Sequence, residues 1–473
     1  MSGQVQNEFS PEAAAKLPSP LDVPEAMWTR YSTRAPRYTS YPTAPQFHDG
    51  FDRDRARAEY EACRERDAIS LYLHIPYCER RCLYCGCHLF IKKDRTVGRE
   101  YVTRMLREAE LVTALTGRGR RVLQLALGGG TPNFLLPEDM RRLIEGLRER
   151  FEFPADGERS IEIDVRTVDE DYIDGLLDLG FNRFSLGVQD LNVEVIDRLR
   201  KNQSSDYVGR VVEHLRRRGV MNALNFDLMY GLPGQTAETM AGSVDEVIAM
   251  RPSRIALFGY AHVPWIRPHQ AGVEKLGLPG DAERVAIWGT AFTKFQAAGY
   301  VPIGMDHFAE PEDELYRAQI HGVLHRNFMG YTTHRGLDQV ALGVSSIAAV
   351  GAVYVQNEKE LTNYDATIDR GELPWIKGYV LTDDDRVRRD IIIDLFANFH
   401  LDTAAFGRTH GLRFADAFAP EIERLAPLVA DGLLEITDEA IHVHPLGRFF
   451  IRNVCMVFDR YLGADTARFS KTV

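Results

Sequence analysis

The stretch that decides the fold is residues 69–87, which read ISLYLHIPYCERRCLYCGC. Its first part is rich in β-branched and aromatic side chains, a composition typical of a buried strand. Four cysteines follow within ten residues, at positions 78, 82, 85 and 87, whereas the other two, Cys63 and Cys455, stand alone. In a reducing compartment such a cluster predicts metal or redox chemistry and not disulfides.

Strand-like runs of this kind alternate with longer amphipathic segments of helical period. The runs are residues 69–75, 122–127, 160–165, 183–188, 223–230 and 254–263. The alternation predicts an α/β fold with a parallel sheet, either an open doubly wound sheet or a partial (β/α) barrel. In both architectures ligands bind at the carboxyl ends of the strands.

The beginning of the chain departs from this alternation. Residues 1–50 contain PSP, RAP and YPTAP, a density of proline that predicts an extended N-terminal arm. The arm also carries several tyrosines. We expect it to cover the entrance to a binding site without joining the core.

The alternation continues through residues 51–362, and residues 363–473 predict a smaller, mostly helical C-terminal domain. It has an expected helix over 382–399, a hairpin over 433–443 and a final helix over 447–462. This order resembles a winged helix. Because the final helix has no Lys/Arg-rich stripe, a packing or lid role is favoured over DNA binding.

Composition narrows the classes of function. The chain has 473 residues, of which 45% are hydrophobic and 26% charged, as in ordinary globular proteins. A formal net charge of −11 and a pI near 5.8 argue against wholesale binding of nucleic acid. No apolar run reaches about 18 residues, and residues 1–17 lack the pattern of a secretion signal. We therefore expect a cytoplasmic, soluble protein without nucleic-acid or membrane partners.

The cysteine spacing has three interpretations. Positions 78, 82 and 85 would also form one stripe of a buried helix, but the charged residues 79–81 disfavour this. Structural zinc usually takes two ligand pairs from separated segments, and the sequence has no second C-x2-C motif or histidine pair. Three thiolates in one loop suit a four-iron cluster whose fourth iron stays open to a small molecule.

Glycines and polar side chains follow the later runs. A glycine-rich turn after the second run contains neither GxGxxG nor a P-loop lysine, and its glycines let the backbone approach a ligand closely. Polar residues at or beyond the ends of the next runs would converge on one rim. The candidate set is 128–132, Glu162, Asp164, Gln189 and Asp227.

The C-x3-C-x2-C motif of Cys78, Cys82 and Cys85, placed after the first strand, is similar to the signature of radical S-adenosylmethionine (SAM) enzymes. The resemblance implies a partial (β/α)6 TIM-like barrel, with the arm and the smaller helical domain attached to it. It also implies that these three cysteines bind one 4Fe-4S cluster and that SAM binds the open iron.

From about residue 31 to residue 462 the chain further resembles the oxygen-independent coproporphyrinogen III oxidase family. The shared motifs are PRYTSYPTA (36–44), LHIPYCERRCLYCGC (73–87), GGGTP (128–132), FNRFSLGVQD (181–190), DLMYGLP (227–233), YAHVP (260–264), IGMDHFA (303–309), LHRNFMGYTT (324–333) and IRNVCMVFD (451–459). Several of these motifs are absent from generic radical SAM proteins, so the resemblance is specific.

This resemblance implies a radical SAM oxidoreductase that converts two propionates of coproporphyrinogen III to vinyl groups, giving protoporphyrinogen IX in haem biosynthesis. It implies two SAM molecules, a small electron-donor protein or reductase, and a non-ligating role for Cys87, and we expect a monomer. Catalytic side chains are not identified. The implied cofactor-binding residues are Tyr72, Tyr84, Gly129, Gly130, Thr131, Glu162, Gln189, Lys201, Asp227, Ala261 and Ile347.

Two departures from the family pattern affect the second SAM site. Lys201 stands where an arginine is usual, so the charge is kept and the bidentate fork is lost. Met329 stands where a glutamine is usual, and a thioether cannot make the amide's hydrogen bonds. The alternatives are a paralogue acting on another tetrapyrrole, as a methyltransferase or ring-opening enzyme, or a haem-binding chaperone without turnover.

Overall fold

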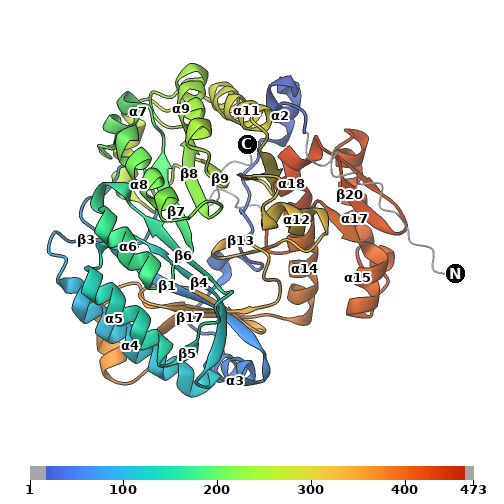
Figure 1. The fold of residues 1–473 in the computed structure, drawn as a ribbon. Helices are drawn as coiled ribbons and strands as arrows, with labels where there is room; N and C mark the ends of the chain where they lie inside the picture. Colours follow the sequence, from blue (N-terminus) through green and yellow to red (C-terminus); the bar gives the residue numbers. More distant parts are fainter. Residues whose placement is uncertain (1–16, 464–473) are drawn as a thin grey trace.

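The computed structural model describes residues 17–463, and its centre is a large sheet (Figure 1). Six of its strands are parallel and coincide closely with the six predicted runs. They are β1 (Ala68–Ile75), β4 (Arg120–Gly129), β6 (Glu158–Ile163), β7 (Arg183–Gln189), β8 (Leu224–Tyr230) and β9 (Arg254–Gly259).

The order of these strands decides between the two predicted architectures. Each strand pairs in parallel with the next one along the chain, from β1 through β4, β6, β7 and β8 to β9. A doubly wound sheet would reverse this order at a switch point, whereas the order of these six strands runs in one direction. The predicted partial (β/α) barrel is therefore confirmed.

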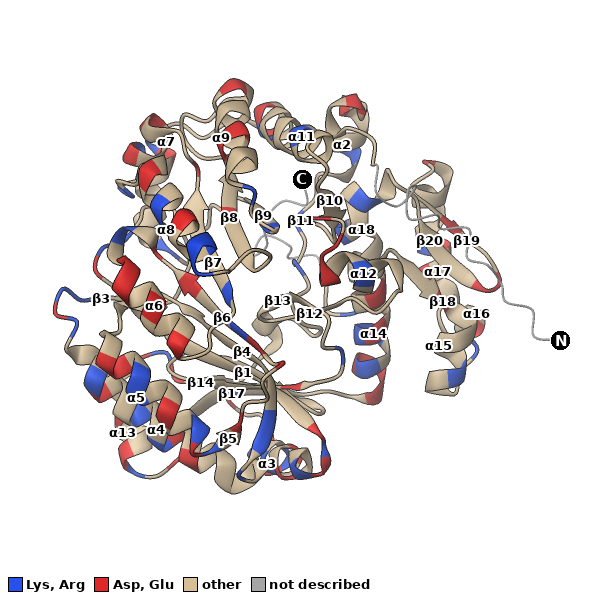
Figure 2. Ribbon diagram, in the orientation of Figure 1, with Lys and Arg blue, Asp and Glu red and all other residues tan. Residues whose placement is uncertain are grey.

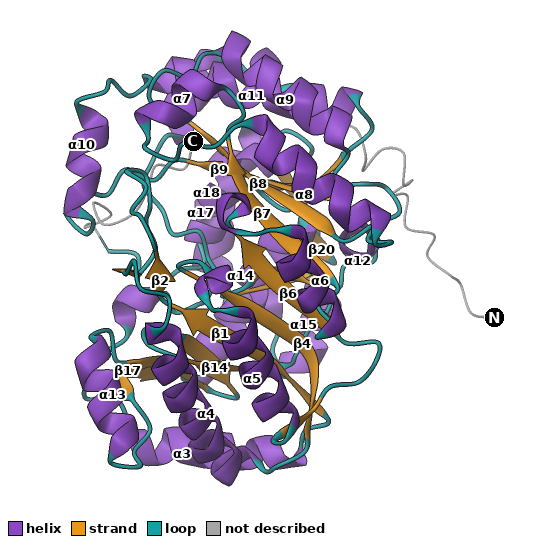
Figure 3. Cartoon of the chain, turned by 60° about the vertical axis from the view of Figure 1, so that its left-hand side comes forward, coloured by secondary structure: helices purple, strands orange, loops and turns teal. Residues whose placement is uncertain are grey.

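Helices return the chain between strands and cover the outer face of the barrel (Figure 3). In one of them, Met140, Leu143, Ile144 and Leu147 recur at helical spacing and are buried, so one stripe of the helix faces the sheet. The main helices are α4 (Val97–Thr116), α5 (Pro137–Arg148), α6 (Glu170–Asp178), α8 (Ser205–Arg217), α9 (Ala237–Met250) and α11 (Asp281–Ala297).

The sheet continues beyond the six strands at both edges. One added strand is parallel to β1, the others pair antiparallel, and the last one ends at Val380. The sheet thus extends past residue 363, the predicted start of the second domain. The added elements are β10 (Val301–Ile303), β11 (His307–Ala309), α12 (Glu314–Ile320), β14 (Asp338–Leu342), β15 (Ile347–Val350), β16 (Val353–Asn357), α13 (Leu361–Asp369) and β17 (Trp375–Val380).

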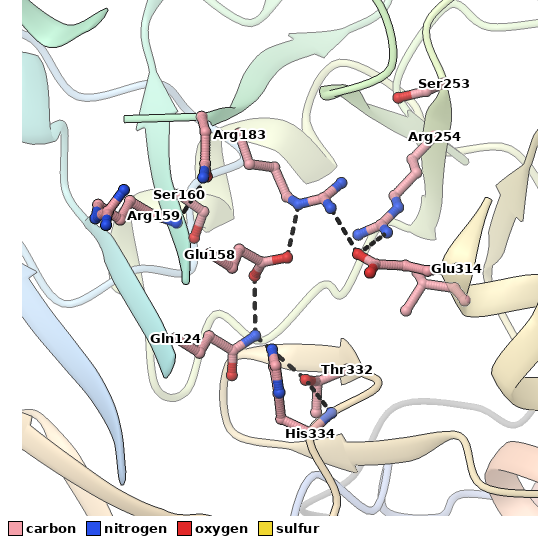
Figure 4. A network of polar contacts seen from close by, with 12 residues as sticks. Gln124, Glu158, Arg159, Ser160, Arg183, Ser253, Arg254, Glu314, Thr332 and His334 are labelled. Atoms are coloured by element: carbon pink, nitrogen blue, oxygen red, sulfur yellow. Dashed lines mark hydrogen bonds and ion pairs between the residues drawn. The ribbon is translucent and has the colours of Figure 1, made fainter. Parts of the chain in front are cut away.

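A network of charged side chains lies at the amino-terminal edge of the barrel (Figure 4). Arg183 and Arg254 begin β7 and β9, and both bind the carboxylate of Glu314 in α12, at 2.7 and 2.9 Å. Arg183 also binds Glu158 at 2.7 Å, and Arg254 binds Asp313 at 2.8 Å. The network joins the first residues of three strands to one helix, which fixes this end of the barrel.

The arm joins the core, contrary to the prediction. Part of it forms helix α2 (Glu25–Tyr31), and Tyr38 and Tyr41 are fully buried in a second hydrophobic core that they share with the C-terminal residues. The Tyr38 hydroxyl donates to Asp459 over 3.0 Å. The expectation that the arm does not join the core is wrong, because these rings fill the interior of that core. Residues 1–16 of the predicted arm lie outside the described residues.

The C-terminal segment contains the predicted helix and hairpin. The final helix is much shorter than predicted: the chain leaves it after Met456, where Arg388 donates to the Phe458 carbonyl over 3.1 Å. The elements are α14 (Asp383–Asn398), β18 (His400–Asp402), α15 (Thr403–His410), α16 (Phe414–Ala417), α17 (Ala419–Ala430), β19 (Leu434–Ile436), β20 (Ala440–Val443) and α18 (Ile451–Met456).

Residues of both charges are interspersed along helices such as α5 and α14 (Figure 2). None of the helices within residues 17–463 is both long enough and apolar enough to cross a lipid bilayer.

We expect Tyr38→Ala to lower the free energy of unfolding by about 3–5 kcal/mol, because it removes a buried aromatic ring and the hydrogen bond to Asp459 Oδ2. Chemical denaturation measures this. Leu21→Ala is the control, since Leu21 also belongs to the arm but is 50% exposed, and it should cost less than about 1 kcal/mol. Equal, small costs for both variants would contradict the core role of the arm.

Arg254→Met should lower the free energy of unfolding by about 3–5 kcal/mol, because the Asp313 side chain, only 6% exposed, is left as a buried charge. Adding Asp313→Asn should restore part of the loss, because it removes the buried charge and keeps an oxygen for the Leu315 N–H that Asp313 caps. Arg370→Met breaks an exposed ion pair with Glu372 and should cost at most about 1 kcal/mol. The network would not be important for stability if Arg254→Met cost no more than this control.

Candidate active site

A cavity of about 610 Å³ lies at the carboxyl ends of the parallel strands. Five strands contribute to it, through Gly129, Glu162, Gln189, Asp227 and Phe258, because parallel strands end at a common edge. Of the residues that the resemblance implies for binding the cluster and SAM, eleven line this cavity together. They are Cys78, Cys82, Tyr84, Cys85, Gly129, Gly130, Thr131, Glu162, Gln189, Lys201 and Asp227.

The cysteine loop leaves β1 and is closed at its base by a short pair of strands, β2 (Tyr77–Cys78) and β3 (Phe90–Ile91). The Lys92 N–H donates to the Cys78 carbonyl over 3.0 Å. The loop therefore begins and ends at one point, which limits the positions that its thiols can take.

Side chains from the segment after β9 hold the other side of this loop. Arg267 Nε donates to the Gly86 carbonyl over 2.8 Å, and Gln270 Nε2 donates to the Tyr84 carbonyl over 2.9 Å. His269 Nε2 lies 2.8 Å from the Cys85 carbonyl, to which it donates. These three contacts tie the loop to the far side of the barrel, and sequence reasoning identified none of them.

The thiols face the cavity, and their chemistry fits an iron-sulfur cluster. Cys78 Sγ lies 3.1 Å from Thr131 Oγ1, and the Cys87 N–H donates to Cys85 Sγ over 3.4 Å. Within residues 17–463, no three Cys, His, Asp or Glu side chains have donor atoms placed to share a single metal ion. Sulfur donors spread around one cavity are what a multi-iron cluster requires.

The glycine-rich turn passes close to the first strand. Gly129 has φ +113°, and a Cβ there would lie 2.6 Å from the His74 ring. A Cβ on Gly130 would lie 2.8 Å from the Tyr77 carbonyl. A larger residue at Gly130 would displace the backbone beside the cysteine loop, and one at Gly129 would meet the His74 ring in a conformation that favours glycine. Glycine is therefore favoured at both positions.

Two carboxylates lie in the floor of the cavity. Glu162 Oε2 accepts from the Gly129 N–H over 3.2 Å, and Asp227 accepts from Ser185 over 2.8 Å and from Asn225 over 2.9 Å. Burial raises the pKa of Glu162 to about 7, and the charge of Asp227 adds to this shift. Burial also raises the pKa of Asp227. Both groups stand ready to accept hydrogen bonds from a polar ligand.

Lys201 is buried and points into the cavity. Its ammonium group donates to the Gly187 carbonyl and to the Gln189 side-chain oxygen. The same oxygen accepts from the Tyr84 hydroxyl over 3.0 Å. A lysine thus connects β7 to the cysteine loop at the position where the resemblance implies an arginine.

The cavity also contains an ion pair that sequence reasoning did not identify. Arg166 Nη2 lies 2.5 Å from Asp164 Oδ2, and Arg166 also donates to the Lys201 carbonyl. Asp164 was a candidate, but Arg166 was not. Its only sequence signal is a basic residue just beyond the end of the third parallel strand.

Three of the implied residues lie outside this cavity. The Tyr72 hydroxyl is 3.1 Å from His74 Nδ1 in β1. Ile347 begins β15 and packs against a small cluster that includes Phe328. Ala261 lines a second cavity beyond the end of β9. Whether they bind SAM stays a prediction.

Comparison with protein families assigns two parts of the chain. Residues 72–247 match the Radical SAM superfamily, and residues 381–450 match the HemN C-terminal domain. The first range contains the cysteine loop and four of the five strands that contribute to the cavity, since β9 lies beyond residue 247. The second contains α14 and the hairpin β19–β20.

Relatives cover almost the whole chain. The oxygen-independent coproporphyrinogen III oxidase of Escherichia coli is 41% identical over 457 residues, which is 96% of this chain and 99% of that protein. The enzyme of Pseudomonas aeruginosa is 41% identical over 94% of this chain and 97% of its own length. The solved structure of the E. coli enzyme, described as a radical SAM enzyme, matches with a TM-score of 0.87 and covers 90% of this chain and 98% of that one. The chain belongs to the oxygen-independent coproporphyrinogen III oxidase family of radical SAM enzymes.

Proposed function

We propose that this protein catalyses the oxidative decarboxylation of two propionate side chains of coproporphyrinogen III, giving protoporphyrinogen IX. Each propionate would lose carbon dioxide, one hydrogen atom to the radical that the bound cofactors supply, and one electron to an external one-electron acceptor, and become a vinyl group. The observation that carries the proposal is the joint placement of Cys78, Cys82 and Cys85 with the glycine turn and two buried carboxylates around one cavity. The identity of the substrate is inferred from the relatives of the chain, which are coproporphyrinogen III oxidases.

The side chains around the cavity divide the work of holding the cofactors. Cys78, Cys82 and Cys85 hold the 4Fe-4S cluster, while Cys87 does not. When bound, the cluster and SAM supply the hydrogen-abstracting radical chemistry that such a reaction needs. Around them, backbone groups of the glycine turn and the side chains of Glu162 and Asp227 bind the polar groups of SAM.

A radical at this site has to be kept away from water and from other side chains. The cavity lies between the closed cysteine loop and the strand ends, and the contacts of Arg267 and Gln270 with the loop keep its backbone fixed. Fixed geometry matters because hydrogen abstraction needs the reacting atoms in contact. These residues therefore act by positioning the loop.

The supporting partners follow from the same proposal. The protein acts as a cytoplasmic monomer, and a small redox protein or reductase supplies electrons to the cluster. Anaerobic turnover with coproporphyrinogen III, SAM and a chemical reductant tests the function directly. Protoporphyrinogen should form. A methylated or ring-opened product, or tight haem binding without turnover, would assign one of the alternatives.

Substitution of single cysteines tests which of them bind the cluster. Alanine in place of Cys78, Cys82 or Cys85 should abolish bound iron and SAM cleavage, because each change removes one of three thiolates. Cys87→Ala should retain iron and sulfide close to the parent level. Iron and sulfide analysis of anaerobically purified protein measures both. Loss of the cluster from Cys87→Ala alone would overturn the ligand assignment.

Substitution of Lys201 tests its part in binding SAM. Replacing this buried cation with methionine should weaken SAM binding by about ten- to a hundredfold, the usual effect of losing a charged hydrogen-bond donor, whereas Lys201→Arg should bind SAM at least as tightly as the parent. The control is Lys294→Met, because Lys294 of α11 forms an ion pair with Asp245 of α9, away from the cavity. Equilibrium dialysis over a wide range of SAM concentration measures affinity and stoichiometry.

We expect two SAM molecules per chain in the parent. A single molecule would show that Lys201 and Met329 mark a lost second site, and unchanged affinity in Lys201→Met would show that this lysine has no part in binding SAM.

A further inference from the structure

A second cavity, of about 290 Å³, lies beside the first, beyond the carboxyl ends of β8 and β9. Three parts of the chain that are far apart in sequence close it: the arm, helix α11 and the segment around α18, whose elements lie together in Figure 1. Its aromatic and charged lining residues are Trp28, Arg34, Arg37, Tyr230, Tyr260, His262, Trp265, Asp281, Arg284, Trp288, Asp306, Phe449 and Arg452.

Two of the four lining arginines have no carboxylate partner. Arg37 donates to the Gly259 carbonyl over 2.8 Å. Arg284 donates to the Tyr260 carbonyl over 3.5 Å, and its guanidinium lies 5.6 Å from the centre of the Tyr230 ring. Neither forms an ion pair within the part of the chain that the structure describes. Each keeps N–H donors for a further acceptor, since a guanidinium has five.

The fold holds these cations close together. Arg452 is buried and donates to the carbonyls of Ala35 and Pro36 in the arm. Burial, followed by the positive charge of Arg37, lowers the pKa of Arg452 to about 9. Like charges held near one another in a partly buried site favour an anion between them.

The carboxylates in the lining do not remove this excess. Asp306 accepts from His307 over 2.7 Å and from Arg326 over 3.4 Å, and it also interacts electrostatically with Arg37, so its single charge is shared among three groups. Asp281 lies at the first turn of α11. With four guanidinium groups in the lining against two carboxylates, the cavity is electropositive.

Tight packing maintains the position of Arg284. Gly231 has φ +82°, and a Cβ there would lie 2.4 Å from the guanidinium. A Cβ on Gly259 would lie 2.9 Å from the Tyr230 ring. Gly231, just after β8, and Gly259, at the end of β9, therefore leave room for a cation stacked on an aromatic ring at the strand ends.

The second cavity adjoins the first through neighbouring residues of the same strands. Met229 and Phe258 line the cysteine cavity, whereas Tyr230 and Gly259, the next residues, line the arginine cavity. A volume of about 290 Å³ is too small for a tetrapyrrole macrocycle but suits one of its propionate side chains. A substrate with several propionates could place one here and another at the cysteine cavity.

We propose that this arginine cavity binds a propionate carboxylate of the tetrapyrrole substrate, through Arg37 and Arg284. The inference rests on the proposed function and adds to it the residues that recognise the substrate. Planar guanidinium groups match the geometry of a carboxylate, and the surrounding aromatic rings fit the methylene groups of the propionate side chain. The carboxylate of SAM is the other source of this chemistry, and the test separates the two.

The test measures equilibrium binding without turnover. Coproporphyrin III is titrated into the cluster-bearing protein in the absence of SAM and followed by its fluorescence. Arg37→Gln and Arg284→Gln should each raise its dissociation constant by about ten- to a hundredfold, and Arg284→Lys should lose less because it keeps the charge. The control is Arg141→Gln, whose arginine lies on α5 in an exposed ion pair with Glu145.

Two further measurements distinguish recognition of a carboxylate from a structural role. The tetramethyl ester of coproporphyrin has no carboxylates, so its affinity should be the same in the parent and the variants. SAM affinity should also be unchanged. Thermal denaturation verifies folding, and Arg284→Gln decides the matter if Arg37→Gln does not fold.

Unchanged porphyrin affinity in Arg284→Gln, or an equal loss for the ester, would overturn the inference. A fall in SAM affinity instead would assign the cavity to SAM and also overturn it. If the parent forms protoporphyrinogen while the variants bind coproporphyrin III as the parent does, the inference fails and the proposed function stands. A parent that neither binds nor converts the tetrapyrrole would overturn both.

Discussion

The parallel register of the barrel strands is the constraint on which the site depends. Ile75 of β1 lies opposite Gly129 of β4, and Gly187 of β7 lies opposite Asp227 of β8. Because side chains alternate between the two faces of a strand, a slip by one residue would turn the cavity-lining groups outward. The charged network at the amino-terminal ends of the strands stabilises this register. There Arg183 and Arg254, which begin β7 and β9, bind the same carboxylate of Glu314.

A second dependence links the arm to the cavities. The rings of Tyr38 and Tyr41 fill the core of the C-terminal segment, and Arg452 of that segment donates to the arm's backbone. The arm is thereby fixed across the barrel mouth, where it places Arg37 against the Gly259 carbonyl. Residues with no part in binding a cofactor thus determine the shape of the arginine cavity.

Sequence reasoning identified the barrel because six β-rich runs with intervening helical periods leave few other architectures, and it identified the cysteines because their spacing is specific. It could not place the arm in the core. Proline-rich segments have no periodicity from which burial can be deduced, and the partner of Tyr38, Asp459, lies more than four hundred residues away. His269 was missed for the same reason, because it contacts a loop that only the folded chain brings near. Arg166 pairs with a sequence neighbour, Asp164, but its contact with the Lys201 carbonyl also depends on the fold.

Lys201 shows how such a site accommodates a change in a binding residue. Its ammonium is already satisfied by the Gly187 carbonyl and the Gln189 side chain, so the buried charge has partners before any ligand binds. Arg166 does not supply the missing fork, because its guanidinium is held by Asp164 and by the Lys201 carbonyl. The positive charge of the site is therefore retained while its directional bonding is not. A ligand carboxylate would meet a point charge here, and the planar geometry needed to orient it would have to come from elsewhere in the site.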